Sequence, residues 1–242
     1  MVDLREDGVY ETVCAAKGHR QFTILQSPKW ALLFDAGALA LHDNYLREAI
    51  ATFSAALENF WAFYVRVIGR VHGLPDELRK ELRGQTKLSE RRFGAMCFAY
   101  ALEERAAYPF DPTWVRDLRN PVIHDGRFAS RDEAMKYGQH VYRAMLTMAC
   151  RLRDAHAEEY GEETMAGLAD AHRSARAKVG KIAGEARFPT LAVMTLLDSQ
   201  MMHNPPMSFA DALEDWRTFN WWNMAKTGTP HAAADDSPTR VE

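Results

Sequence analysis

Apolar side chains recur every three or four residues through most of the chain. The clearest stripe lies within residues 45–71, and its members are Ile50, Phe53, Leu57, Phe60 or Trp61, Tyr64 and Ile68. This spacing predicts a long amphipathic helix that ends near Gly73. Similar stripes predict further helices after residue 28, from Ser89 through Leu102, over 131–156 and over 160–180. Pro75 predicts the start of a short charged helix over 76–83, and residues 113–124 predict a helical stretch that Pro121 interrupts and Gly126 stops.

Polar residues predict where several of these helices begin. Ser27, followed by proline, predicts an N-cap with proline in the first helical turn. Ser89 predicts another cap, and Ser130 with Glu133 has the sequence pattern of a capping box. The short connections between helices indicate a helical bundle over residues 28–156.

The two ends of the chain follow other patterns. Residues 9–14 and 21–25 are rich in β-branched and aromatic types and predict a hairpin within an N-terminal β element, residues 1–27. Residues 157–226 predict a helical C-terminal extension, in which 190–197 fits either strand or helix. Residues 227–242 are rich in small and polar types and predict a disordered tail. The fold class is therefore mainly α.

Ser208 predicts the cap of a last helix that extends to about residue 224 and carries several aromatic side chains. Its tryptophans are Trp216, Trp221 and Trp222. These rings either pack back on the domain or form an exposed docking surface.

The composition of the chain excludes several classes of function and of site. The 242 residues are 47% hydrophobic, which is ample for a sizeable core, and the net charge of −3 supplies no global basic field for nucleic acid. Cys14, Cys97 and Cys150 are widely spaced and form no CxxC pair, so a disulfide framework and a four-ligand zinc site are not expected. We expect a reducing, cytoplasmic location, no membrane span and no signal peptide. The chain contains no P-loop and no HExxH motif, so we expect neither a cofactor nor a metal.

The most informative segment for chemistry is residues 118–126, LRNPVIHDG. On a helix, Asn120 and His124 lie one turn apart on one face, and Arg119 can reach the same cleft. Arginine clamps phosphate oxygens, and histidine exchanges protons near neutral pH, so the group suits a phosphodiester. The structural alternatives are that His124 caps helix carbonyls and that Arg119 pairs with Asp117 or Asp125.

This segment resembles the arginine, polar residue, three-residue spacer and histidine signature of the HEPN superfamily. Residues 44–50 (NYLREAI) and 54–58 (SAALE) resemble early helices of that family, and the polar helix start at residue 130 follows the motif as in family members. The resemblance covers about residues 28–156. Pro121 departs from the family's pattern.

The resemblance implies a dimeric α-helical bundle in which two motifs face each other across one composite cleft. It implies metal-independent endoribonuclease activity in toxin–antitoxin, abortive-infection or other antiviral defence systems. Arg119 and His124 would be catalytic, Asn120 would support them, and Glu58 matches a supporting acidic position on an early helix. An antitoxin or a partner defence protein would bind the chain.

Nearby basic residues are candidates for contacts with RNA, and they are Arg116, Arg127 and Arg131. Each of them is equally compatible with a solvated helix face. Two functions follow: a ribonuclease that leaves 2′,3′-cyclic phosphate ends, or an inactive HEPN-type module that binds a partner protein. Pro121 and the acidic net charge favour the second, and a chance match of the motif is a third alternative.

Overall fold

The computed structural model describes residues 5, 7–14, 16–179 and 186–218, except for a few side chains in two of the helices. The predicted tail, 227–242, and the tryptophans at 221 and 222 lie outside these residues. The described chain is mainly helical, as predicted. Its elements are β1 Val9–Val13, β2 Arg20–Leu25, α1 Lys29–His42, α2 Leu46–Val71, α3 Asp76–Gln85, α4 Ser89–Glu104, α5 Pro112–Ile123, α6 Arg131–Ala155, α7 Ala157–Val179, β3 Thr190–Leu191, α8 Leu196–Met201 and α9 Phe209–Thr218.

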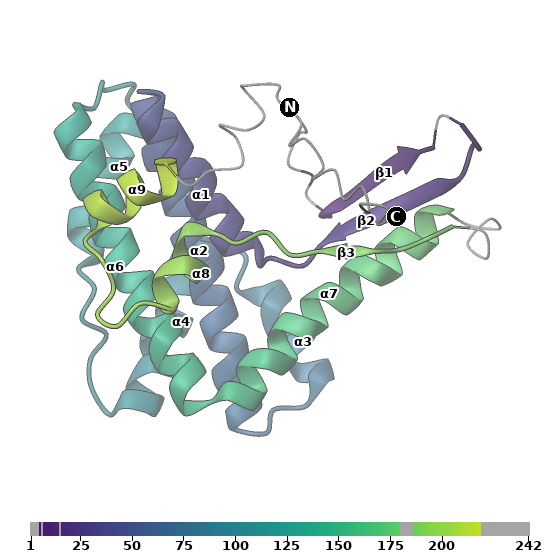
Figure 1. The fold of residues 1–242 in the computed structure, drawn as a ribbon. Helices are drawn as coiled ribbons and strands as arrows, with labels where there is room; N and C mark the ends of the chain where they lie inside the picture. Colours follow the sequence, from purple (N-terminus) through teal and green to yellow (C-terminus); the bar gives the residue numbers. More distant parts are fainter. Residues whose placement is uncertain (1–4, 6, 15, 180–185, 219–242) are drawn as a thin grey trace, which may run out of the picture.

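Helix α2 runs through the middle of the bundle and contacts α1, α4, α6 and α7 (Figure 1). The stripe that predicted this helix is buried as expected: Ile50, Phe53 and Phe60 are fully enclosed. Burial of each such side chain contributes about 1.5–3 kcal/mol. This one helix therefore organises the main core.

Two glycines let the aromatic core close around α2. A Cβ atom at Gly37 in α1 would lie 2.7 Å from Cδ1 of Phe53. A Cβ atom at Gly138 in α6 would lie 2.9 Å from Cε2 of the same ring and 2.8 Å from Cε1 of Phe209. Real Cβ atoms do not approach other atoms so closely. Glycine in the interior of a helix is less stabilising than alanine. At both positions, however, the ring of Phe53 occupies the space that a Cβ atom would need.

The predicted hairpin is present, and a third strand joins it. β1 and β2 pair antiparallel, with Val9 opposite Ile24, while β3 pairs with β2 in parallel, with Thr190 opposite Ile24. Phe22 and Ile24 form a second, smaller core with Ala175 and other residues of α7. In Figure 1 this sheet lies beside the far end of α7, away from the bundle.

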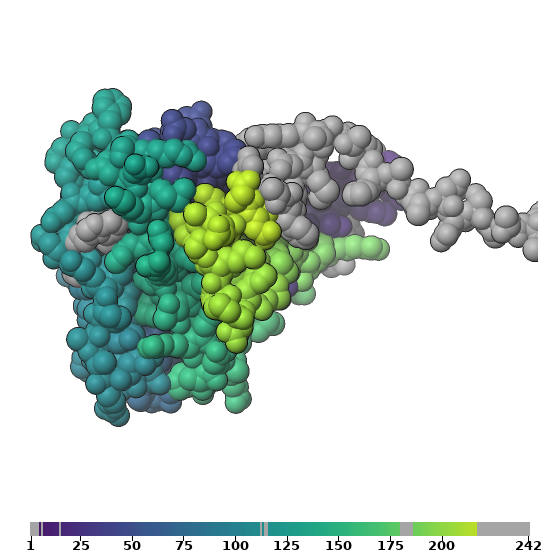
Figure 2. Space-filling view, turned by 60° about the vertical axis from the view of Figure 1, so that its left-hand side comes forward, coloured from purple at the N-terminus to yellow at the C-terminus, as the bar shows by residue number. Residues whose placement is uncertain are grey.

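Residues from the predicted C-terminal extension contribute to both cores. The ambiguous segment 190–197 contains strand β3 and then the start of α8. Leu196, Phe209 and Trp216 are buried in the main core, so the Trp216 ring packs back on the bundle. Figure 2 shows this yellow-green segment spread over the teal surface of α6. No described helix has both the length and the apolar run that a bilayer crossing requires.

The structure confirms two predicted caps and corrects two others. Ser130 and Glu133 form the capping box of α6, and Ser208 Oγ accepts the backbone N–H of Asp211 at 3.2 Å. Ser27 does not cap α1, because Pro28 is at the N-cap and the Ser27 hydroxyl donates to the Val193 carbonyl instead. Ser89 is the first residue of α4, and its hydroxyl points to another helix.

Candidate functional site

Helix α5 carries the motif and has well-defined ends. It begins after Asp111, whose carboxylate accepts the Thr113 backbone N–H at 2.8 Å. The expected interruption at Pro121 does not occur, since the helix continues to Ile123. The Pro121 carbonyl accepts the backbone N–H groups of Asp125 and Arg127, which turns the chain back at the end of the helix. The motif residues thus lie on one continuous helix and its C-terminal cap.

Arg119 lies between α5 and α2, with 31% of its side chain exposed. Its Nη1 donates to Asn120 Oδ1 at 3.2 Å, and its Nη2 lies 3.9 Å from Glu58 Oε1. Its Nε is buried and has no acceptor among the described residues. A buried donor without an acceptor is costly, about 1–3 kcal/mol, and the guanidinium group therefore has capacity for a further anionic oxygen. Arg119 makes no ion pair with Asp117 or Asp125, the structural alternative for this residue, within the part of the chain that the structure describes.

Glu58 faces Arg119 and is itself bound by residues of α4. Ser89 Oγ donates to Glu58 Oε1 at 2.7 Å, and Arg92 Nη1 lies 3.9 Å from Glu58 Oε2. The structure therefore brings together Arg119, Asn120 and Glu58. Ser89 and Arg92 were not predicted as site residues, because nothing in the sequence indicates that α4 meets α2 at this level.

A buried tyrosine lies near this group of residues, on the side of the core. The Tyr137 hydroxyl lies 2.6 Å from Ser54 Oγ, which donates to the Ile50 carbonyl, so the tyrosine is the donor to the serine. Burial raises the pKa of Tyr137 to about 12, while the Ser54 bond and the nearby charge of Arg119 act in the opposite direction. Tyr137 was also missed, because its position in the apolar stripe of α6 predicts only a core residue.

His124 lies at the C-cap of α5 and is exposed. Its backbone N–H donates to the Asn120 carbonyl at 2.8 Å, but its ring has no hydrogen bond or ion pair among the described residues. The single chain does not bring the imidazole into contact with Arg119. A second group, from RNA or from another copy of the chain, is needed to complete any site that uses both residues.

The three predicted RNA contacts each have a partner within the chain. Arg116 pairs with Asp117 at 3.2 Å, and Arg127 pairs with Glu133 at 2.9 Å, both on the surface. Arg131 Nη1 donates to the Leu41 carbonyl at 2.9 Å. Surface pairs of this kind contribute at most about 1 kcal/mol and exchange readily for phosphate contacts.

Arg47 is the basic residue that sequence analysis missed beside His124. It lies in the first turn of α2, and its Nη2 donates to the Ile123 carbonyl at 3.3 Å. Its segment, residues 44–50, resembles a family helix, and this resemblance was the available signal. Arg47, which also lies 3.9 Å from Glu48, therefore places a positive charge at the C-terminal end of α5, at the carbonyl that precedes His124.

No group of three or more His, Cys, Asp and Glu side chains that could hold a metal ion occurs among the described residues. In comparisons with known proteins, no family model, no curated protein and no solved structure matches this chain. The function must therefore be inferred from the chemistry of the site.

Proposed function

We propose that the chain is a metal-independent endoribonuclease of the HEPN type that acts as a homodimer. One observation carries the proposal: Arg119 is oriented by Asn120 and Glu58, its Nε has no acceptor among the described residues, and the exposed imidazole of His124 follows five residues later at the end of the same helix. An oriented guanidinium group stabilises negative charge on phosphoryl oxygens, and an imidazole exchanges protons near neutral pH.

The proposed reaction uses the 2′-hydroxyl of RNA as its nucleophile. The neutral ring of His124 accepts the 2′-hydroxyl proton while the oxygen attacks the adjacent phosphorus. Arg119 stabilises the charge that develops on the phosphoryl oxygens. The bond from phosphorus to the 5′-oxygen breaks, and this oxygen takes a proton from the protonated ring of the partner's His124. The products are a 2′,3′-cyclic phosphate and a 5′-hydroxyl.

Two exposed aromatic side chains support dimer formation at this end of α5. Phe128 follows the motif and is 96% exposed, and Tyr45, 63% exposed, precedes the turn that carries Arg47. Large apolar groups left in water next to a site indicate a surface that another molecule covers. A two-fold dimer through this surface would bring two copies of His124 towards one phosphate.

The test is cleavage of labelled RNA by the purified protein in the presence of a chelator. We expect 2′,3′-cyclic phosphate and 5′-hydroxyl ends, and no cleavage where the nucleotide on the 5′ side of the bond is 2′-deoxy. His124→Ala and Arg119→Ala should each abolish cleavage. Two exposed residues away from α5 provide matched controls, His72→Ala and Arg91→Ala, and both should cleave normally. Continued cleavage by either α5 variant contradicts the proposal.

A role as a defence or toxin effector is proposed from the resemblance alone. Expression in cells should then arrest growth, and the two α5 variants should relieve the arrest. A cognate antitoxin or partner defence protein would bind the wild-type chain and suppress the arrest.

The alternative function is an inactive HEPN-type module that binds a partner protein. It is favoured by the carboxylate of Glu58, which already faces Arg119 and competes with a phosphate, and by the lack of any group that orients the His124 ring among the described residues. In that case neither RNA cleavage nor growth arrest is expected, and Phe128 would contact the partner.

A further inference from the structure

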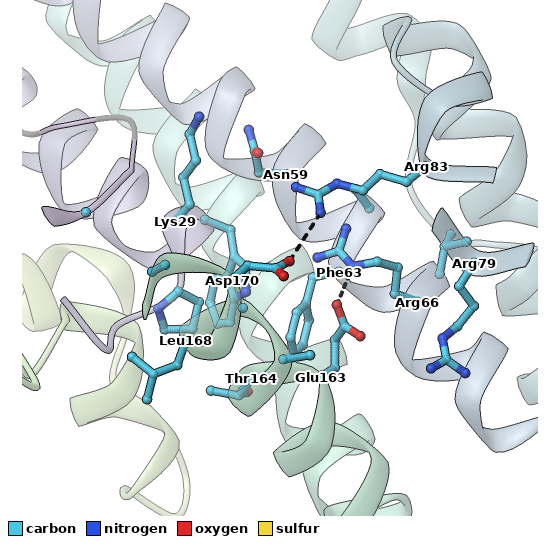
Figure 3. A pocket seen from close by; sticks show the side chains of 18 of the residues that line it. Lys29, Asn59, Phe63, Arg66, Arg79, Arg83, Glu163, Thr164, Leu168 and Asp170 are labelled. Carbon is cyan, nitrogen blue, oxygen red and sulfur yellow. Dashed lines mark hydrogen bonds and ion pairs between the residues drawn. The ribbon is translucent and has the colours of Figure 1, made fainter. Parts of the chain in front are cut away.

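A cavity of about 790 Å³ lies beside α2, and none of the motif residues lines it. Its walls come from α1, α2, α3, α4 and α7 and from the connection between β2 and α1 (Figure 3). This volume lies within the roughly 300–1,000 Å³ that is typical of sites for small molecules.

The cavity is strongly basic in a chain that is acidic as a whole. Seven Lys and Arg residues and three Asp and Glu residues line it, a balance of 7 − 3 = +4, whereas the whole chain carries −3. The basic residues come from separate parts of the chain, so the concentration of charge is produced by the fold. A recessed site lined by one sign of charge attracts ligands of the opposite sign.

Part of this charge is held by ion pairs within the chain. The carboxylate of Glu163, which is buried and lines the cavity, binds Arg66, which also lines it, and Arg70, which is outside the lining, the latter at 2.9 Å. Arg79 is bound by the Leu74 carbonyl and by Asp76. These arginines have fixed positions, as a preorganised anion site requires.

Two of the other cations that line the cavity, Arg83 and Lys87, are exposed and can exchange partners. Arg83 is 3.9 Å from Asp170, and both side chains are more than half exposed, so this pair contributes at most about 1 kcal/mol. Lys87 is exposed, and no ion pair involves it among the described residues. Both cations can therefore turn to a ligand at little cost.

Part of the cavity wall is apolar. Leu33, Phe63 and Leu168 belong to this apolar wall, and Figure 3 shows Leu168 across the view from Arg79 and Arg83, with Phe63 between them beside Arg66. An inorganic anion would leave this wall in water. A ligand that joins an apolar ring to a chain of phosphates would contact both this wall and the cations.

We propose that this cavity binds a nucleoside di- or triphosphate, with its phosphates at Arg83 and Lys87 and its base against the apolar wall. The inference does not depend on the proposed function, because none of these residues belongs to the motif. Arg92 lines the cavity but also lies 3.9 Å from Glu58, so it is left out of the test.

The experiment is calorimetric titration of the full chain with ATP, GTP, AMP, adenosine and tripolyphosphate, without RNA. We expect ATP or GTP to bind at least about tenfold more tightly than AMP, and adenosine not to bind at concentrations up to about 1 mM. Absence of binding by both triphosphates at that concentration overturns the proposal. Equal affinity for tripolyphosphate overturns the nucleoside part of it.

The variant Arg83→Glu/Lys87→Glu should weaken triphosphate binding at least about tenfold, as expected when two phosphate contacts become repulsive. Lys80→Glu/Arg91→Glu is the matched control: both residues are exposed on the same two-helix region, lie outside the cavity and give the same change in net charge. Equal losses in the two variants overturn the assignment to the cavity. If the cavity variant loses binding to a labelled oligoribonucleotide while neither form binds triphosphates, the cavity is an RNA contact and the proposal is wrong.

Discussion

At the scale of single residues, the geometry of Arg119 matters more than its charge. Its Nη1 bonds Asn120 and its Nη2 lies 3.9 Å from Glu58 Oε1, so neighbouring side chains fix the orientation of the planar donor fork that would meet a phosphate. Arg119→Lys keeps the charge but loses this fork. We expect the cleavage rate under single-turnover conditions to fall about 10²–10³-fold, the usual effect of removing one donor to a developing oxyanion. Arg91→Lys is the matched control, and a rate within about twofold of wild type for Arg119→Lys would contradict the assigned role.

A second prediction at this scale concerns Asp35, a buried carboxyl group in α1. Its Oδ1 accepts the Leu196 backbone N–H at 3.0 Å, and burial raises its pKa well above the usual range, with a smaller contribution from Asp198. In the unfolded chain this group ionises near pH 3.9. The folded chain therefore binds more protons above that pH, and the free energy of unfolding decreases as the pH rises towards the folded-state pKa.

Asp35→Asn keeps the acceptor and removes this ionisation. We expect the variant to have a higher Tm than wild type at pH 7.5, by about 2–4 °C for each kcal/mol gained, and the difference to shrink as the pH approaches about 4. Thermal unfolding between these pH values measures the effect. A lower Tm for the variant at pH 7.5 would show that the charged carboxylate is stabilising in the folded chain.

At the scale of elements, replacing a helical glycine by alanine changes the free energy of unfolding in opposite directions, depending on what surrounds the glycine. Gly94 in α4 is exposed, and a Cβ atom added there would meet no neighbouring group within 4 Å, so Gly94→Ala should raise the free energy of unfolding by about 0.5–1 kcal/mol. Gly138 in α6 faces Phe53 and Phe209, where a Cβ atom would lie 2.8–2.9 Å from their rings, so Gly138→Ala should lower it by about 1–3 kcal/mol. Urea unfolding of the two variants tests the contrast, which fails if both changes stabilise the chain.

Sequence periodicity predicted α1, α2, α4 and α6 because each of them has an apolar stripe over several turns, whereas α3, which buries no side chain, was predicted from Pro75 and its charged residues. It could not assign residues 190–197, because Thr190 and Leu191 form a strand only through β2, which lies far earlier in the chain. It also misassigned Ser27 and Ser89, since their hydroxyls bind distant partners in place of the local helix start. Contacts between segments far apart in sequence decided each of these cases.

The residues of the candidate site were likewise predicted only where they are close in sequence or lie in a segment that resembles the family. Arg119 and Asn120 are neighbours on α5, and Glu58 was identified by resemblance, but the supporting Tyr137, Arg47 and Arg92 come from other helices. Their roles depend on how α2, α4 and α6 pack around α5. The basic cavity was not predictable, because its cations are dispersed over several elements and each one alone is typical of a solvated surface.

At the scale of the whole molecule, the proposed site is complete only in a dimer, and Phe128 tests this directly. Replacing this 96% exposed ring by serine costs the single chain no buried contact, so any effect reports on association. Phe128→Ser should shift the protein from dimer to monomer in light scattering and abolish RNA cleavage, with an unchanged circular dichroism spectrum. Phe98→Ser is the matched control, because Phe98 is a 73% exposed ring on α4, and it should remain dimeric and active. If wild type is monomeric and cleaves RNA, or if Phe128→Ser remains an active dimer, two copies of His124 do not meet through this surface.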